Sequence, residues 1–321
     1  MIVKSSSNWR LFLFLPALAG IMLCSARASW AECPAADADA LVWLDKMSRS
    51  LQQVSYHGVV TFQRGDEMQA MDVANTIADG MATERLTELT GQGAEVVRVN
   101  HPLDCVHPGH QLLQLGTSLK SGHCGVSSNY RFGVTDGELI AGRQAVRILI
   151  HPRDMYRYGY VLELDRETGL LLKSSTIGRG DKVLEKFQFA SLSYTSNPEG
   201  ESGPRLVHQA KHPEYINRKL SAGGGRLAWS VNWVPHGFTA TDQQAAISSR
   251  KTYTDGLAVF SIFVEALSQD IRPGEGVART GGTISYTRGM HMKGVPVLVT
   301  VIGEVPLNTA RMVADSVVEA S

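Results

Sequence analysis

Histidines and cysteines gather in one short stretch of this sequence, and their types and spacing could do chemistry. The stretch contains six candidate metal ligands: His101, Cys105, His107, His110, His123 and Cys124. Thiolate and imidazole groups are the ligands that hold zinc tetrahedrally. However, the prolines and glycine at 102, 108 and 109 predict a loop, and the spacing follows no common zinc pattern. We therefore prefer an interpretation without a metal.

A disulfide explains both cysteines of this stretch. In an oxidising compartment, a Cys105–Cys124 bond closes a loop of about twenty residues, worth about 3 kcal/mol on the chain-entropy model. Cys33 would then be left free or available for an intermolecular bond. The pairings Cys33–Cys105 and Cys33–Cys124 stay open, because spacing alone does not fix connectivity.

The sequence holds no pattern that is typical of an active site. It contains no Gly-x-Ser-x-Gly elbow, no His-Glu-x-x-His, no phosphate-binding Gly-Lys-Ser/Thr loop and no Ser-x-x-Lys. Gly223–Gly225 lacks the preceding strand and following helix of a nucleotide loop, so we interpret it as a hinge. We expect no enzymatic activity and no cofactor. A zinc-dependent hydrolase remains a third hypothesis, which would require bound metal.

Aromatic residues offer a second kind of chemistry, the recognition of a partner. The segment Trp229-Ser-Val-Asn-Trp-Val-Pro-His-Gly-Phe238 combines large rings with a proline and a glycine that force a turn. Its candidate partner-binding residues are Trp229, Trp233, Pro235, His236 and Phe238. The alternative is that the segment is a structural corner whose rings belong to the core.

A mixed aromatic and basic patch could meet an anionic lipid, because rings pack on acyl chains and guanidinium groups pair with phosphate. The candidate lipid-binding residues are Tyr56, Val60, Phe62, Arg153, Tyr156, Arg157 and Tyr158. The alternative is a hairpin with a solvated face.

The N-terminus predicts export of the chain. Two basic residues, Lys4 and Arg10, precede an apolar run that is too short to span a bilayer, and small residues follow it. This is the pattern of a signal peptide over residues 1–31, with cleavage after Ala31 or Ala28. The whole sequence has 31 basic and 31 acidic residues, and three of the basic ones lie in the signal. The mature chain is therefore slightly acidic, which argues against a nucleic-acid binder.

The elements that position these residues fall into two domains, and the first covers residues 32–195. Residues 37–52 predict an amphipathic helix, with Leu41, Leu44, Met47 and Leu51 at helical spacing. The period then changes to two, and strands are predicted at about 56–63, 81–89, 95–100, 145–151, 158–165, 170–177 and 183–194. Turns are predicted at Asp79-Gly80, Asp136-Gly137, Thr168-Gly169 and Gly180-Asp181. The economical packing is a curved antiparallel sheet, a half-barrel, wrapped on the helix.

The second domain covers residues 226–321, after a polar linker at 196–225. We expect a smaller α+β domain, with strands near 231–233, 251–265, 283–287 and 295–303. The run of apolar residues on both faces of 257–264 suggests a strand that is buried on both sides. A closing helix is predicted from Thr309 to Glu319, capped by Asn308, with Ala310, Val313 and Val317 on one face.

Three phrases in this second domain carry a resemblance: residues 229–238, 253–265 and 297–311. Together they resemble the C-terminal domain of the periplasmic RseB/MucB family. In addition, His151–Asp165 followed by Thr168–Lys173 is similar to the strand-turn-strand segment of the lipoprotein-carrier fold (LolA/LolB), which the N-terminal domain of that family looks like. The resemblance spans nearly the whole mature chain and implies the same half-barrel for the first domain.

The resemblance also implies a function. It predicts a soluble periplasmic negative regulator that binds the periplasmic segment of a transmembrane anti-sigma factor and shields it from regulated proteolysis. A lipid or lipopolysaccharide signal, bound in the cavity or between the domains, would release it in envelope stress. The alternative is a periplasmic lipid or lipoprotein carrier without a signalling role. The sequence leaves the oligomeric state open, homo-oligomers included.

Overall fold

The structure is a computed structural model, and it describes residues 38–90, 95–99, 125–194, 228–241, 250–267 and 274–320. All of them belong to one compact unit, Cys33–Ser321. The predicted signal peptide, the three cysteines at 33, 105 and 124, the histidine cluster and the linker at 196–225 lie outside the described residues. Within the described ranges, no group of side chains could hold a metal ion, and no helix is long and apolar enough to cross a membrane.

The N-terminal region is one antiparallel sheet with a helix, α1, against it. The strands follow the order β4-β3-β2-β1-β9-β8-β7-β6-β5. The bounds are α1 Ala38–Gln53, β1 Tyr56–Arg64, β2 Glu67–Ala78, β3 Met81–Glu88, β4 Glu95–Val99, β5 Tyr130–Ile140, β6 Arg143–Pro152, β7 Gly159–Asp165, β8 Leu171–Ile177 and β9 Val183–Ser193. Short 3-10 turns, η1 Gly125–Ser128 and η2 Arg179–Asp181, complete it.

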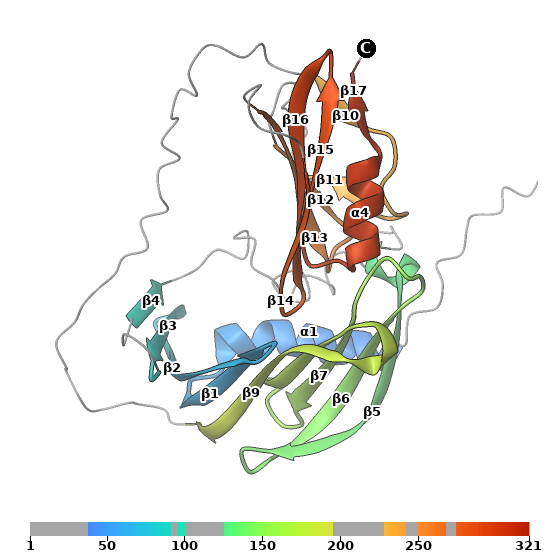
Figure 1. Ribbon diagram of the computed structural model, residues 1–321. Coiled ribbons are helices and arrows are strands. Elements are labelled where there is room, and N and C mark those ends of the chain that lie inside the picture. The colour runs from blue at the N-terminus through green and yellow to red at the C-terminus, as the bar shows by residue number, and fades with distance from the viewer. Residues whose placement is uncertain are drawn as a thin grey trace, which may run out of the picture. The chain divides into compact units, whose positions relative to one another are not determined.

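Helix α1 forms where the spacing predicted it, and it fills the face of the sheet. Its buried residues Ala40, Leu44 and Met47 recur at three- and four-residue intervals, as on one face of a helix. They join a core cluster with sheet residues such as Ile148 and Leu162. Figure 1 shows α1 lying across the strands of this sheet. Antiparallel strands around one helix confirm the predicted mostly-β α+β architecture.

One of the four predicted turns of this region is wrong. Asp136-Gly137 lies inside β5, at an irregularity in its pairing with β6. A Cβ on Gly137 would overlap the carboxylate of Glu163 and the backbone of Ala145, so this glycine permits a close approach rather than a reversal. The reversal comes later, at Ala141-Gly142, where both residues have positive φ.

The C-terminal region is a six-stranded antiparallel sheet in the order β11-β12-β13-β16-β15-β14, beside a small β10-β17 pair. The bounds are β10 Trp229–Val231, β11 Thr239–Ala240, β12 Arg250–Thr254, β13 Val259–Ala266, β14 Glu275–Thr280, β15 Thr283–Met292, β16 Val295–Gly303, α4 Leu307–Asp315 and β17 Val317–Glu319. Helix α4 packs on β15 and β16 (Figure 1). Valines of β16, from 297 to 301, are the centre of the core under it.

The structure corrects three sequence predictions in this region. The single strand at 251–265 is a hairpin, because Asp255-Gly256 forms a turn between β12 and β13. On β13 only one face is buried, with Phe260, Ile262 and Val264 inward and the other residues at most half-buried. The closing helix begins at Leu307 after Pro306 rather than after an Asn308 cap, and it ends before Val317, which pairs in β17 with β10.

Candidate functional site

A buried arginine joins the two sheet regions. Arg157, just before β7, is 4% exposed, and its guanidinium contacts Asp154 on its own segment. The same group donates to the carboxylate of Asp255 in the β12–β13 turn and to the backbone carbonyl of His236. We call the contacts between residues 125–194 and residues 228–320 the joint. Arg157 lies at one end of it.

Asp255 is the acceptor around which this end of the joint is built. It is fully buried in its ion pair, and its Oδ2 also accepts a hydrogen bond of 3.1 Å from the hydroxyl of Tyr130. Its other oxygen accepts from the backbone N–H groups of Leu257 and Ala258, at 2.9 and 2.8 Å. The carboxylate therefore shapes the β12–β13 turn and holds Arg157 at once. A buried charge is tolerated only when paired and hydrogen-bonded in this way.

Aromatic rings enclose the same arginine. The guanidinium carbon lies 5.0 Å from the ring centre of Phe238 and 5.9 Å from that of Tyr130. A desolvated guanidinium is attracted to the negative face of such rings. Two candidates from separate sequence patches, Arg157 and Phe238, are thus brought into contact by the fold.

Two loops of the C-terminal region need glycine where they approach the N-terminal region. Gly237 has φ of +85°, and a Cβ there would overlap the amide group of Asn129. Gly256 has φ of +99°, and its Cβ would lie 2.7 Å from a methyl group of Val126. Each position combines a left-handed backbone with the absence of space for a side chain.

A second row of contacts runs along the segment before β7. The Tyr158 hydroxyl donates to the carbonyl of Val305 at 3.0 Å, and the Thr309 hydroxyl donates to the carbonyl of Tyr156, also at 3.0 Å. The rings of Tyr156 and Trp233 meet edge to face with their centres 5.3 Å apart. The joint is therefore a continuous set of polar and aromatic contacts.

The five candidate partner-binding residues lie at or beside this joint. Trp229 and Phe238 are buried in the C-terminal core, where Phe238 packs on Phe260. Pro235 is buried and Trp233 half-buried, whereas the His236 side chain is exposed. In this conformation His236 is the exposed residue of the five, and the other four pack against the fold wholly or in part.

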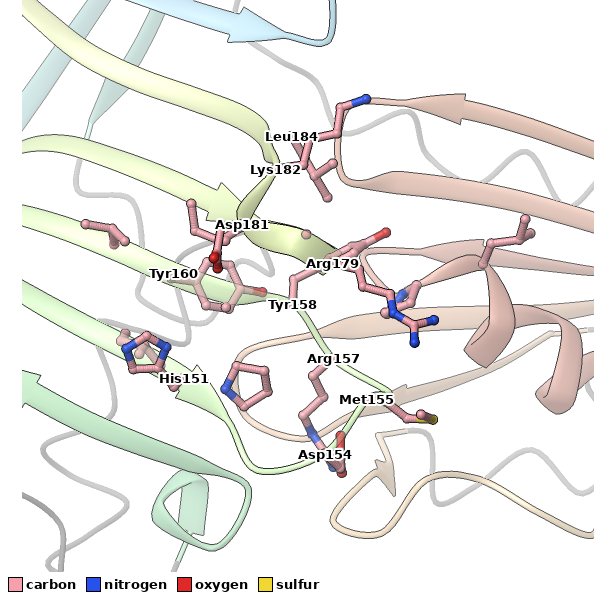
Figure 2. Close-up of a pocket in the computed structure, with 18 of the residues that line it drawn as sticks. His151, Asp154, Met155, Arg157, Tyr158, Tyr160, Arg179, Asp181, Lys182 and Leu184 are labelled. Atoms are coloured by element: carbon pink, nitrogen blue, oxygen red, sulfur yellow. The ribbon is translucent and has the colours of Figure 1, made fainter.

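A cavity of about 550 Å³ opens next to the joint. Figure 2 shows Arg157, Tyr158 and Tyr160 following one another on its wall, with Arg179, Asp181 and Lys182 coming from the connection between β8 and β9. Ile150, Val161 and Leu184 contribute apolar surface, and Arg279 and Leu307 come from the C-terminal region. The volume falls in the range of small-molecule sites, about 300–1,000 Å³.

Tyr160, one of the residues that line this cavity, has an unusual polar group. The Tyr160 hydroxyl is buried and, among the described residues, has no hydrogen-bond partner. Burial raises the pKa of Tyr160 well above its ordinary value, so this hydroxyl keeps its proton. A buried group of this kind costs free energy unless something pairs with it.

Three cations at the cavity were missed by the sequence reasoning: Arg179, Lys182 and Arg279. All three side chains are exposed, and the acidic Asp181 lies among them. Arg179 and Lys182 could have been suspected from the charged turn Arg-Gly-Asp-Lys, but Arg279 is distant in sequence and reaches the cavity only through the fold.

The candidate lipid-binding residues are divided among three places. Arg157 and Tyr158 line the cavity. Tyr56 and Val60 are buried in a separate core cluster, and half-buried Phe62 packs beside Arg64 on β1. Arg153 donates from Nε to the carbonyls of Ser127 and Tyr130 at 3.2 Å, and Tyr156 contacts Trp233. The fold therefore does not assemble them into one site.

Two domains of one family match this chain in order. Residues 39–207 match the MucB/RseB N-terminal domain, and residues 225–318 match the MucB/RseB C-terminal domain. Together the two matches span most of the sequence, including both sheets and the joint.

Relatives and solved structures agree with this match. The chain is 32% identical to the sigma factor AlgU regulatory protein MucB of Pseudomonas aeruginosa, over 87% of this chain and 91% of that protein. It is 25% identical to the sigma-E factor regulatory protein RseB of Haemophilus influenzae, over 85% and 89%. A crystal structure of MucB in complex with MucA(peri) matches with a TM-score of 0.66 and 30% identity, covering 88% of this chain and all of that one. The chain therefore belongs to the MucB/RseB family of sigma-factor regulatory proteins, and it is a regulator rather than an enzyme.

Proposed function

We propose that this protein binds the periplasmic segment of a transmembrane anti-sigma factor and shields it from the protease that starts its degradation. The observation that carries the proposal is the match of both domains to MucB, a protein that has been crystallised with MucA(peri). The proposal includes a periplasmic location, reached through the signal peptide at residues 1–31.

The joint supplies the two-state element that a regulator needs. It contains a buried, paired arginine, several aromatic rings and several hydrogen bonds, and these contacts would be exchanged for water if the sheets separated. A ligand shifts such an equilibrium only by its difference in affinity for the two states. A strong switch therefore requires a signal that prefers the released state by a few kcal/mol.

The proposed signal is a lipid or lipopolysaccharide that occupies the cavity. Apolar residues such as Leu184 would contact acyl chains, while Arg179 and Lys182 would face an anionic head group. Because Tyr158 and Arg157 belong both to the cavity wall and to the joint, occupation of the cavity would act on the joint directly.

The first test uses the mature chain and the periplasmic segment of the anti-sigma factor from the same genome. We expect calorimetry to give saturable one-to-one binding, and we expect the segment to resist cleavage by its envelope protease when the mature chain is in excess. Absence of binding, or binding without protection, contradicts the proposal.

A substitution tests whether the Trp229–Phe238 turn touches the partner. His236→Asp places a charge on its exposed candidate and should weaken binding by about fivefold, which corresponds to about 1 kcal/mol. The control is His291→Asp, another exposed histidine in the C-terminal region, on β15. Equal affinities of the two variants would remove the turn from the interface.

The signal is tested on the assembled complex. Lipopolysaccharide should release the anti-sigma segment from the wild-type protein, and the double variant Arg179→Ala/Lys182→Ala should need about tenfold more of it. The control replaces two exposed cations away from the cavity, Arg49 and Lys293, with alanine. If the same concentration of lipopolysaccharide releases the segment from both double variants, this cavity is excluded as the signal site.

A lipid or lipoprotein carrier is the second candidate function, and the cavity beside the joint is the observation that favours it. A carrier would move fluorescent lipid between vesicles at a rate that the anti-sigma segment does not affect. The regulator proposed here would bind lipid without such transfer.

A further inference from the structure

A glycine turn of the C-terminal region packs on an ion pair of the N-terminal region. The backbone N–H of Gly282 donates to Oε1 of Glu185 at 3.2 Å, and the same oxygen lies 3.1 Å from Nε of Arg64. A Cβ on the neighbouring Gly281 would lie 2.5 Å from this oxygen. The turn between β14 and β15 therefore needs glycine to dock on Glu185.

A second carboxyl group lies close to this contact. Glu304 follows β16 and is half-buried, and its backbone N–H donates to the carbonyl of Val259 at 3.0 Å. Its neighbour Val305 accepts the hydrogen bond from Tyr158 across the joint. Within the described residues, no donor is hydrogen-bonded to the side chain of Glu304. At this end of the joint, two carboxyl groups, those of Glu185 and Glu304, thus share one neighbouring guanidinium group, that of Arg64.

These surroundings set the proton affinity of Glu304. Burial, and then the negative charge of Glu185, raise the pKa of Glu304 from 4.5 to about 7, while Arg64 opposes the rise. Arg64 is 44% exposed and already paired with Glu185, so it compensates only in part. Glu304 retains its proton because its ionisation would place a second negative charge beside Glu185, at a site shielded from water.

The groups that interact electrostatically with Glu304 belong to the N-terminal sheet region. The titratable groups with such an interaction are Arg64 on β1, Glu185 on β9, and Tyr158 and Tyr160 at β7. Burial raises the pKa of Tyr158 and of Tyr160 above 10, so both remain neutral. The group at this contact with a pKa near neutrality is Glu304.

We propose that Glu304 is a proton switch in the joint, which is tightest when this carboxyl group is protonated and loosens when it ionises beside Glu185. Separation of the sheets would return Glu304 to water and to its ordinary proton affinity. The closed joint therefore binds more protons than the open one at intermediate pH. Its extra stability is present in acid and is lost as the pH rises through about 7.

Hydrogen exchange of the mature chain, corrected for the intrinsic pH dependence of exchange, tests the switch. Protection of the Gly282 amide, which donates across the joint to Glu185, should fall by about tenfold between pH 6 and pH 8.5 in the wild type, given a pKa near 7. Glu304→Gln, which cannot ionise, should remove this dependence and keep the protection high at pH 8.5. The matched control is Glu265→Gln, an exposed glutamate on β13, which should behave as the wild type.

A direct titration keeps the inference testable if a variant fails to fold. Carbon-13 NMR of the side-chain carboxyl groups in the wild-type chain should give a midpoint near 7 for Glu304. In Glu185→Gln this midpoint should move toward 4.5, because the neighbouring negative charge is gone. A wild-type midpoint near 4.5, or a pH-dependent protection that survives in Glu304→Gln, overturns the proposal.

Discussion

Arg157 shows how one side chain links regions that are far apart in the sequence. It is fully buried, and its partners come from its own segment, from the β12–β13 turn and from the Trp229–Phe238 turn. The net contribution of such a buried ion pair to the free energy of folding is small, because the desolvation of both charges offsets their attraction. Removal of one partner is costly, since the other charge is then left buried and alone.

Asp255→Ala should therefore destabilise the protein by about 3 kcal/mol, the lower end of the cost of breaking a buried pair. The measurement is urea unfolding followed by circular dichroism. Asp136→Ala is the control, because Asp136 makes an ion pair with Arg166 while its side chain is 90% exposed, and we expect a change below about 0.5 kcal/mol. Equal effects of the two substitutions would contradict the account of Arg157.

Asp165 is the corresponding buried carboxylate inside the N-terminal sheet. Burial alone would raise the pKa of Asp165, but hydrogen bonds from Arg143, Tyr194 and two backbone N–H groups outweigh it and lower this pKa below 3.8. The folded protein therefore stabilises the ionised form of Asp165 relative to the unfolded chain. The stability that Asp165 contributes is present above pH 3.8 and is lost as the pH falls through the lowered value.

Asp165→Asn should accordingly destabilise the protein at pH 7 and should show a weaker loss of stability on acidification than the wild type. The free energy of unfolding, measured between pH 7 and pH 2.5, checks this. Glu167→Gln is the control, because Glu167 is 76% exposed although it contacts the same arginine. A parallel pH dependence in wild type and Asp165→Asn would exclude Asp165 as its source.

The turns that connect the strands of the C-terminal region determine how closely the two sheets approach each other. Gly237, Gly256 and Gly281 all have positive φ. At each of them, a side chain of the N-terminal region occupies the place where a Cβ atom would be. Two different costs would follow from a substitution. One is backbone strain, which any positive-φ glycine shares, and the other is the overlap with the neighbouring region.

A comparison of Gly237→Ala with Gly142→Ala separates the cost of backbone strain from the cost of overlap. Gly142 has φ of +77°, but nothing lies within 4 Å of its Cβ position. Gly142→Ala should cost about 1 kcal/mol from strain alone. Gly237→Ala should cost at least about 1 kcal/mol more, because Asn129 must also move. Equal unfolding free energies would mean that the two regions do not approach closely at this turn.

The sequence predicted the elements best where a period was long and regular. Helix α1, strand β16 and most strands of the N-terminal sheet follow their predicted ranges. It failed where a short turn interrupts apolar residues, as at Asp255-Gly256, and where glycine serves packing, as at Gly137. Both failures have one cause: a glycine that reverses the chain and one that admits a neighbour look the same in a sequence.

The whole molecule is coupled through the joint, and this coupling has a thermal consequence. Ion pairs, hydrogen bonds and ring contacts between the two sheet regions should make them unfold together. We expect a single calorimetric transition for the mature wild-type chain at pH 6. Two transitions should appear in Asp255→Ala, because the joint is then the weakest contact. Two resolved transitions in the wild type would contradict this coupling.

Family membership, the α+β class and the two-domain order could be read from the sequence, because hydrophobic period and contiguous motifs are local properties of the chain. The candidate sites could be read only in part. Aromatic and basic residues were singled out by type, yet type does not say whether Phe238 faces a partner or Arg157. The tertiary structure places the Phe238 ring against Arg157, and it brings Arg157 to Asp255 and Arg279 to the cavity from about a hundred residues away. Burial and charge pairing arise only when distant segments meet, and no local pattern records which segments will.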